Sequence, residues 1–174
     1  MFDATGIRAR FLTIMKIESN PFVLIMRHGA AMSRSESPRR PLSTPGRAEV
    51  AKMGAWLSAQ GYAIDEIRHS GILRAEETAE ILAQYLSLAL PPVAVPGLEP
   101  DANPKVLVSS LAEEAKNVIV VAHLPLVYEA VYLLLGSSRP LSELEFETAG
   151  ITILRRTNSG TWDFVAYAEP SLVS

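Results

Sequence analysis

Two histidines and two arginines in this chain have the types needed for chemistry on a phosphoryl group. They are Arg27, His28, Arg74 and His123. The planar guanidinium group of an arginine can hold two phosphate oxygens at once. A neutral imidazole can attack phosphorus, provided that its other ring nitrogen donates its proton to a fixed acceptor. Because a phosphoryl group in transfer spreads negative charge over its oxygens, positioning and charge stabilisation by such side chains would do most of the catalytic work.

These four side chains can meet because each follows a predicted strand. Residues 22–26 and 118–122 are unbroken apolar runs, which are typical of strands buried on both faces, and residues 64–69 predict a further strand. Arg27 and His28 follow the first run, and His123 follows the second. Open α/β sheets bind ligands at the carboxyl ends of their strands. The sequence therefore predicts that residues far apart in the chain converge at one edge of a sheet.

Helices are expected between these strands. Thr44 and Pro45 form a typical helix start, an apolar stripe follows, and Gly61 stands at the expected C-cap. Ser70 is predicted to cap a second helix that runs to about Leu86. Further helices are predicted over residues 105–116 and 126–135, and further strands over residues 93–95, 144–147, 151–155 and 161–167, with a hairpin turn at 158–160.

This alternation predicts an α/β fold. Strands that alternate with helices form a mostly parallel central sheet in a three-layer α/β/α sandwich, and the C-terminal hairpin adds antiparallel strands. We expect residues 21–174 to form a single domain. Residues 1–20 are interpreted as an extension outside that domain, either disordered or preceding a true start at Met15; the apolar stretch from Phe11 to Met15 is short for a secretory signal.

Composition excludes several classes of site. The 174 residues include no cysteine, which rules out disulfides, thiolate catalysis and cysteine-based metal sites. The net charge of −3 gives no reason to expect nucleic-acid binding. No apolar run reaches the roughly 20 residues that span a bilayer, so we expect no membrane segment and a cytoplasmic location.

Four motifs in sequence order resemble the histidine phosphatase superfamily. Residues 24–29 (LIMRHG) look like its signature, residues 40–43 (RPLS) with Gly46 resemble its next conserved segment, and residues 73–78 (LRAEET) resemble its second arginine motif. Residues 122–127 (AHLPLV) are close to the second histidine motif of one branch, the SixA-type phosphohistidine phosphatases. One triplet would be weak evidence, whereas four motifs at the expected strand and helix positions are strong.

The resemblance implies a phosphoglycerate mutase-like fold and a metal-independent phosphatase without a cofactor. It implies that His28 is the nucleophile, with the Gly29 carbonyl as the acceptor that fixes its tautomer. Arg27, Arg74 and His123 would bind the phosphoryl group. Arg40 and Ser43 could also contact substrate, although Ser43 could equally cap the helix that begins near Pro45.

The sequence offers no clear proton donor for the leaving group. Glu99 and Asp101 are weak candidates, and His69 has no matching role and is expected to be structural. A phosphohistidine substrate tolerates a missing acid, because imidazole, with a pKa near 6.5, leaves more readily than an alkoxide. We therefore expect the partner to be a phosphotransfer protein that carries phosphohistidine. A small-metabolite phosphatase acting on sugar or nucleotide phosphates, and a non-catalytic phosphate-binding module, remain as alternatives.

Overall fold

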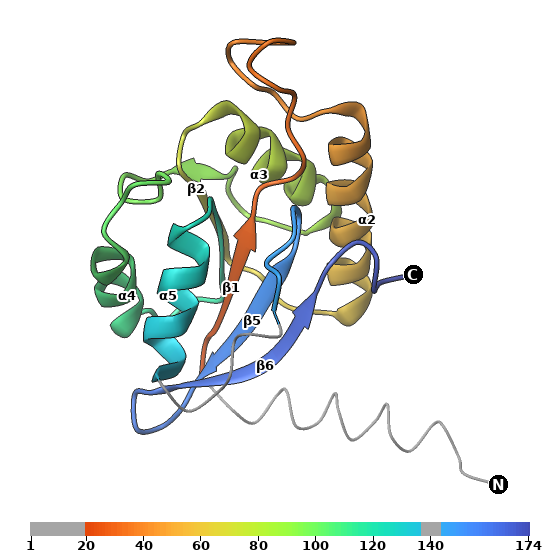
Figure 1. The fold of residues 1–174 in the computed structure, drawn as a ribbon. Coiled ribbons are helices and arrows are strands. Elements are labelled where there is room, and N and C mark those ends of the chain that lie inside the picture. The colour runs from red at the N-terminus through yellow and green to blue at the C-terminus, as the bar shows by residue number, and fades with distance from the viewer. Residues whose placement is uncertain (1–19, 137–143) are drawn as a thin grey trace, which may run out of the picture.

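One six-stranded mixed sheet organises the chain. The computed structural model describes residues 20–136 and 144–174, so the extension predicted for residues 1–20 lies, apart from Asn20, outside the described residues. The strands lie in the order β3-β2-β4-β1-β5-β6 (Figure 1). β3, β2, β4 and β1 run parallel, β5 is antiparallel to β1, and β6 is antiparallel to β5. Their bounds are β1 (Phe22–Arg27), β2 (Glu66–His69), β3 (Val93–Ala94), β4 (Val118–Ala122), β5 (Ile151–Arg156) and β6 (Trp162–Ala168).

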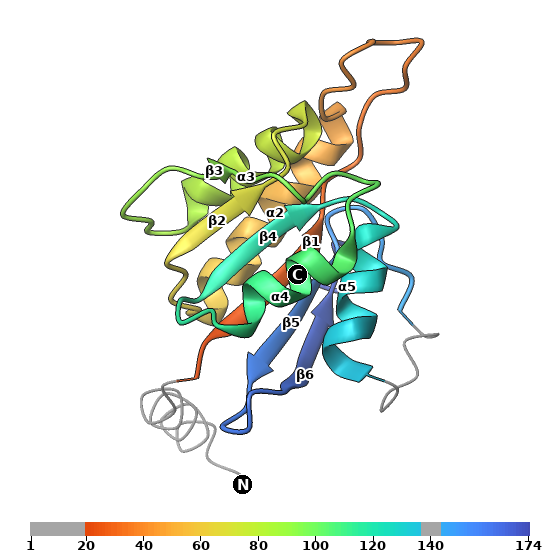
Figure 2. The same ribbon diagram turned by 90° about the vertical axis from the view of Figure 1, so that its left-hand side faces the viewer.

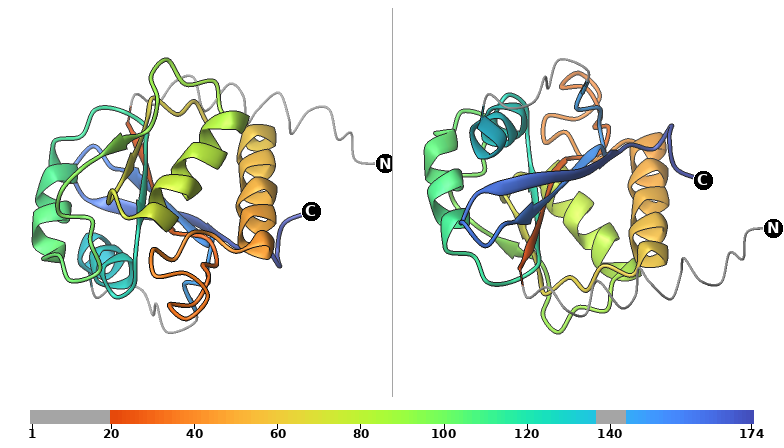
Figure 3. Two further views of the ribbon diagram at one scale, coloured as in Figure 1. Left: turned by 90° about the horizontal axis from the view of Figure 1, so that it is seen from above. Right: turned by 90° about the horizontal axis from the view of Figure 1, so that it is seen from below.

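Helices cover both faces of this sheet. They are α2 (Thr44–Gln60), α3 (Leu73–Tyr85), α4 (Pro104–Ala112) and α5 (Leu126–Leu135). α2 and α3 pack on one face and α4 and α5 on the other (Figures 2 and 3). Alternate residues of β1 divide between two apolar cores, with Leu24 facing α2 and α3 and Ile25 facing α4 and α5. The predicted three-layer α/β/α sandwich is confirmed. None of the described helices has the length and apolarity that crossing a bilayer requires.

α2 begins at Thr44, one residue earlier than the sequence predicted. Ser43 is the N-cap, and its hydroxyl oxygen accepts a hydrogen bond from the backbone N–H of Gly46 at 3.1 Å. Thr44, the predicted cap, is the first helical residue. Gly61 ends the helix with a left-handed φ of 74°, as predicted.

Three other predicted elements differ from the structure. α3 begins at Leu73 and has no side-chain cap, so Ser70 does not have the predicted role. α4 ends at Ala112 because the Glu114 carboxylate accepts from the backbone N–H groups of the next two residues, which forms a turn. Residues 144–147 are not a strand, since Phe146 has a φ of 50° that no strand accommodates.

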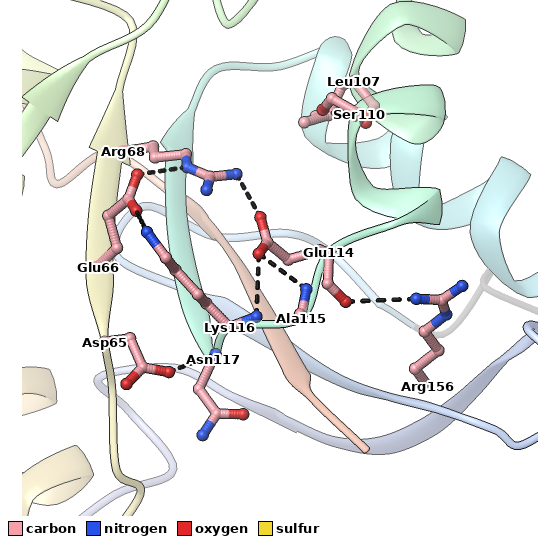
Figure 4. A network of polar contacts seen from close by, with 10 residues as sticks. All are labelled: Asp65, Glu66, Arg68, Leu107, Ser110, Glu114, Ala115, Lys116, Asn117 and Arg156. Atoms are coloured by element: carbon pink, nitrogen blue, oxygen red, sulfur yellow. Dashed lines mark hydrogen bonds and ion pairs between the residues drawn. The ribbon is translucent and has the colours of Figure 1, made fainter. Parts of the chain in front are cut away.

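A network of charged side chains joins the starts of β2 and β4, opposite the histidine ends (Figure 4). Arg68 contacts Glu66 at 2.7 Å and Glu114 at 2.8 Å, and Lys116 contacts Glu66 at 2.9 Å. Hydrogen bonds from Arg68 and Lys116 lower the pKa of Glu66 to about 2. The backbone N–H of Asn117 also donates to a carboxylate oxygen of Asp65 at 2.8 Å. The network lies beside the parallel pairing of β2 and β4, in which Glu66 is in register with Val118 and His69 with Val121.

Candidate active site

Two histidines lie together where β1 and β4 end. Arg27 pairs in register with Ala122, and the backbone N–H of His28 donates to the Ala122 carbonyl at 3.1 Å. This pairing places His28 beside His123, with ring centroids 4.8 Å apart. Both are buried, with 8% of His28 and 1% of His123 exposed. The predicted convergence at the carboxyl ends of the strands is therefore present.

Hydrogen bonds fix the tautomer of His28. Its Nδ1 lies 2.7 Å from the carbonyl oxygen of Gly29, which can only accept, so Nδ1 carries the proton. The other nitrogen, Nε2, accepts from Nε of Arg74 at 3.0 Å. Nε2 is therefore unprotonated, and its lone pair accepts the hydrogen bond from the guanidinium group.

Burial keeps both imidazoles neutral. Desolvation lowers the pKa of His28 to about 4, and the charges of Arg74, Arg27 and Arg40 act in the same direction, while the bond to the Gly29 carbonyl opposes them. Desolvation, followed by the charges of His28 and Arg74, lowers the pKa of His123 to about 3. At neutral pH neither ring carries a positive charge, which leaves the nucleophilic character of an imidazole nitrogen intact.

The two arginines approach the histidines from different elements. Arg27, at the end of β1, donates from Nη1 to the Phe146 carbonyl at 3.0 Å, and the left-handed bend at Phe146 occurs at the residue whose carbonyl accepts this bond. Arg74 lies in the first turn of α3. Burial, then the charges of Arg40 and Arg34, lower its pKa, so these cations lie near one another. Such a cluster of positive charges is suited to an anion with several oxygens.

Thr78 connects the two motifs and was not predicted as a site residue. Its hydroxyl donates to the Arg74 carbonyl at 2.6 Å and accepts from the backbone N–H of Gly29 at 3.1 Å. Thr78 is fully buried. It lies one helical turn after Arg74, and that i, i+4 spacing is the signal from which its proximity could have been inferred.

Ser70 is a second residue that the sequence did not identify. Its hydroxyl lies 2.7 Å from Nε2 of His123, because β2 and β4 are neighbours and both end here. Ser70 was predicted as a helix cap, and only a long 3.3 Å contact from the Ile72 N–H corresponds to that role. The signal for its actual position is the strand order, which the sequence does not specify.

Gly29 is required because the chain packs closely around it. Its φ is not in the left-handed range, but a Cβ atom there would lie 2.5 Å from Cγ2 of Val50. A Cβ on Gly46 would lie 2.0 Å from the Ala30 carbonyl oxygen. The segment after His28 therefore lies directly against the start of α2.

Arg40 and Ser43 are the two other residues predicted to contact substrate. Only Arg40 affects the electrostatics of the site. Nε of Arg40 donates to the Met32 carbonyl at 3.1 Å, and its charge lowers the pKa of both His28 and Arg74. Ser43 donates to the Ala30 carbonyl and accepts from the Gly46 N–H. Of the two roles left open for Ser43, the structure assigns the cap, and we leave it out of the phosphate-binding set.

Glu99 and Asp101 make no contact with this site among the described residues. The Glu99 carboxylate accepts from the backbone N–H of Gly97 at 2.8 Å, within its own loop. His69 is buried and its Nδ1 accepts from the backbone N–H of Gly71 at 3.2 Å, which fits the expected structural role. Within residues 20–136 and 144–174, no three His, Cys, Asp or Glu side chains gather in a way that could hold a metal ion.

Comparison with known proteins gives the same family throughout. Residues 23–99 match the sequence profile of the histidine phosphatase superfamily (branch 1). The phosphohistidine phosphatase SixA of Escherichia coli (strain K12) is 34% identical over 148 residues, which cover 82% of this chain and 89% of that protein. A structure of the protein histidine phosphatase SixA complexed with tungstate superposes with a TM-score of 0.77 at 32% identity, over 86% of this chain and 97% of the other.

A phosphoglycerate mutase from Plasmodium falciparum shares the fold. Its structure superposes with a TM-score of 0.66 at 17% identity, over 90% of this chain and 94% of the other. The predicted phosphoglycerate mutase-like architecture is thus confirmed. The profile match and the match to SixA, which covers most of both sequences, show the family. This chain belongs to the histidine phosphatase superfamily, branch 1, as a SixA homologue.

Proposed function

We propose that this protein is a SixA-like phosphohistidine phosphatase that works through a phosphorylated His28. The observation that carries the proposal is the state of the His28 ring, with Nδ1 bonded to the Gly29 carbonyl and Nε2 unprotonated beside Arg74. A nucleophile for phosphorus needs this arrangement. The likeness to a SixA structure that holds tungstate, a tetrahedral oxyanion, supports an oxyanion site here.

The reaction takes two displacements at phosphorus. In the first, Nε2 of His28 attacks phosphorus, the P–N bond of the substrate breaks, and the departing imidazole takes a proton from solvent. In the second, water attacks the phosphorus on Nε2 and gives up a proton to solvent, the P–Nε2 bond breaks, and inorganic phosphate leaves while His28 regains its lone pair. Arg27 and Arg74 would bind the phosphoryl oxygens through both steps, because their charges match those that develop in transfer.

His123 and Ser70 complete the proposed site. The pair is joined by a 2.7 Å hydrogen bond beside the His28 ring. A ring N–H from His123 or a hydroxyl from Ser70 can donate to a phosphoryl oxygen without bringing a further charge. Arg40 adds positive charge near His28.

The substrate we propose is phosphohistidine on a phosphotransfer protein. No carboxylate of the described residues contacts the two histidines, and the bond broken in phosphohistidine needs the least help from a general acid. The loop between β1 and α2 projects from the body of the protein at the carboxyl ends of the parallel strands (Figure 1), which supports a substrate residue presented by another protein. We further propose that the protein works in the cytoplasm, which cell fractionation would test.

The direct test compares phosphate release from free phosphohistidine by the wild-type protein and by His28→Asn. Turnover should fall at least 10⁴-fold, since the nucleophile is gone. His69→Asn is the matched control, because it removes a buried histidine that lies at the same end of the sheet but outside the proposed site, and it should retain turnover. A base-stable, acid-labile phosphoenzyme should form in the wild type and not in His28→Asn. Near-normal activity of His28→Asn would refute the proposal. Rapid hydrolysis of sugar phosphates with inert phosphohistidine would favour the metabolite phosphatase instead.

A further inference from the structure

The loop between β1 and α2 forms an arm that projects beyond the body of the protein (Figure 1). We define the arm as residues 31–42. An isolated β-bridge joins its two ends, Ala31 and Leu42. A backbone hydrogen bond from Met32 N to Pro41 O at 2.9 Å also joins its two limbs, and bonds from Ser37 N to Ser33 O and from Arg40 N to Ser37 O, both at 3.0 Å, form local turns within it. The arm is therefore a defined structure rather than a loose connection.

Positive charge is concentrated on this arm. It carries Arg34, Arg39, Arg40 and one acidic residue, Glu36, for a net charge of +2 in a chain whose net charge is −3. The Glu36 carboxylate is committed to the arm itself, because Oε2 accepts from both the N–H and the hydroxyl of Ser33, at 2.8 and 2.7 Å. Within the arm, all of whose residues the structure describes, Glu36 forms no ion pair with an arginine, and the arm keeps its net charge of +2.

Two of these arginines face solvent. Arg34 and Arg39 are exposed, and neither makes an ion pair in the part of the chain that the structure describes. Arg40 differs, because its Nε is held by the Met32 carbonyl. An exposed arginine that has no partner in its own chain is free to meet an acidic group on another protein.

The arm lies next to the proposed active site. It begins two residues after Gly29, whose carbonyl orients His28. The charges of Arg40 and Arg34 reach Arg74 strongly enough to lower its pKa. Whatever presents a phosphoryl group to His28 therefore passes close to the arm.

We propose that the arm is a docking element that selects phosphohistidine proteins with acidic residues around the phosphorylated histidine. The inference rests on the proposed function, since it assigns the substrate protein's surface chemistry. A free phosphohistidine fills only the pocket, whereas a protein substrate also covers the rim. Rim charges of opposite sign accelerate encounter and orient the partner, and like charges exclude the wrong one.

Two synthetic peptides of equal length test this directly. Each carries one phosphohistidine, flanked by four glutamates in one peptide and four glutamines in the other. The wild-type protein should hydrolyse the glutamate peptide with a kcat/KM about five- to tenfold higher at low salt, as expected for a few exposed charge pairs. The preference should nearly vanish at about 0.5 M salt, where screening acts within a few ångströms.

Charge reversal on the arm provides the matched comparison. Arg39→Glu should abolish the preference for the glutamate peptide, while its hydrolysis of free phosphohistidine stays within about twofold of wild type. Arg34→Glu should reduce the same preference, read as the ratio between the two peptides so that any effect on the pocket cancels. Lys52→Glu makes the same change of charge on α2, where Lys52 donates to the Pro170 carbonyl, and should keep the preference.

Each other result counts against a specific claim. Equal hydrolysis of the two peptides by the wild type at low salt would overturn the docking proposal. So would an equal loss of free phosphohistidine and glutamate peptide hydrolysis in Arg39→Glu, or Arg39-dependent binding to poly(U) or phosphatidylserine vesicles without any peptide preference. Failure to hydrolyse free phosphohistidine and both peptides would instead refute the proposed function, and the docking proposal with it.

Discussion

Mild acid should destabilise this protein through His28, because the folded site holds that ring neutral. Burial lowers the His28 pKa to about 4 in the folded protein, against about 6.5 when unfolded. The unfolded chain therefore takes up the proton first as the pH falls. The contribution of the neutral His28 ring to the free energy of unfolding is fully present above pH 6.5 and declines through pH 5. Below about pH 4 no more of it is lost.

The size of the effect follows from the two pKa values. Linkage gives a loss of about 2 kcal/mol from His28 between pH 7 and pH 5, and about 3 kcal/mol once the ring is protonated in both states. His123, with a pKa lowered to about 3 by burial, adds a loss of similar size at pH 5. Glu66 adds little to the loss of stability between pH 7 and pH 5. Because its pKa is lowered to about 2, its own stabilising contribution declines only below about pH 4.5.

Urea unfolding at pH 7 and pH 5 measures this loss. Buffers should contain no phosphate, because a ligand of the folded state would add stability of its own. In His28→Asn the loss of unfolding free energy between the two pH values should be about 2 kcal/mol smaller than in wild type. Thr78→Val is the control, because it disturbs the same segment and removes no titrating group, so its loss should match wild type. Equal losses in wild type and His28→Asn would show that the folded site does not hold this ring neutral.

Three further substitutions have defined outcomes. Arg74→Lys removes the planar fork and should lower kcat/KM for phosphohistidine about 10²-fold; a loss below threefold would contradict a bidentate role. Thr78→Val leaves the buried Gly29 N–H without its acceptor and should cost about 1–3 kcal/mol in urea unfolding, whereas an unchanged midpoint would contradict this. The double variant Glu99→Gln with Asp101→Asn should hydrolyse phosphohistidine within about twofold of the wild-type rate, and any hydrolysis of an alkyl phosphate should slow much more. Equal large losses on both substrates would show that Glu99 or Asp101 is a general acid for either leaving group.

The sequence predicted the parts of the site that follow long apolar runs. β1 and β4 are buried on both faces and Arg27 is their only polar residue, so the end of each apolar run is easy to locate. His28 and His123 were found on this basis. The sheet order, by contrast, depends on how helices cross between strands, and Ser70 could not be placed beside His123 without it.

Predictions were wrong where tertiary contacts at the site, and not local sequence preference, determine the backbone conformation. Residues 144–147 alternate like a strand, yet left-handed conformations at Phe146 and Ala149 bend them. The bend accompanies two tertiary bonds, from Arg27 to the Phe146 carbonyl and from the Ala149 N–H to the His28 carbonyl. Local pattern cannot reveal such a bend, because its stabilising partners are more than a hundred residues away in the chain.

Under the proposed mechanism Arg74 has two successive partners. Without a phosphoryl group, its Nε–H satisfies the buried lone pair of His28 Nε2, which would otherwise lack a donor. An arginine can do this without passing on its proton, because its pKa lies far above that of imidazole, so Nε2 remains a nucleophile. An arriving phosphoryl group offers the guanidinium charged oxygens, which are stronger acceptors than a neutral nitrogen. The bond to Nε2 is then exchanged for bonds to the anion, and the lone pair is released when a phosphorus atom is present to receive it.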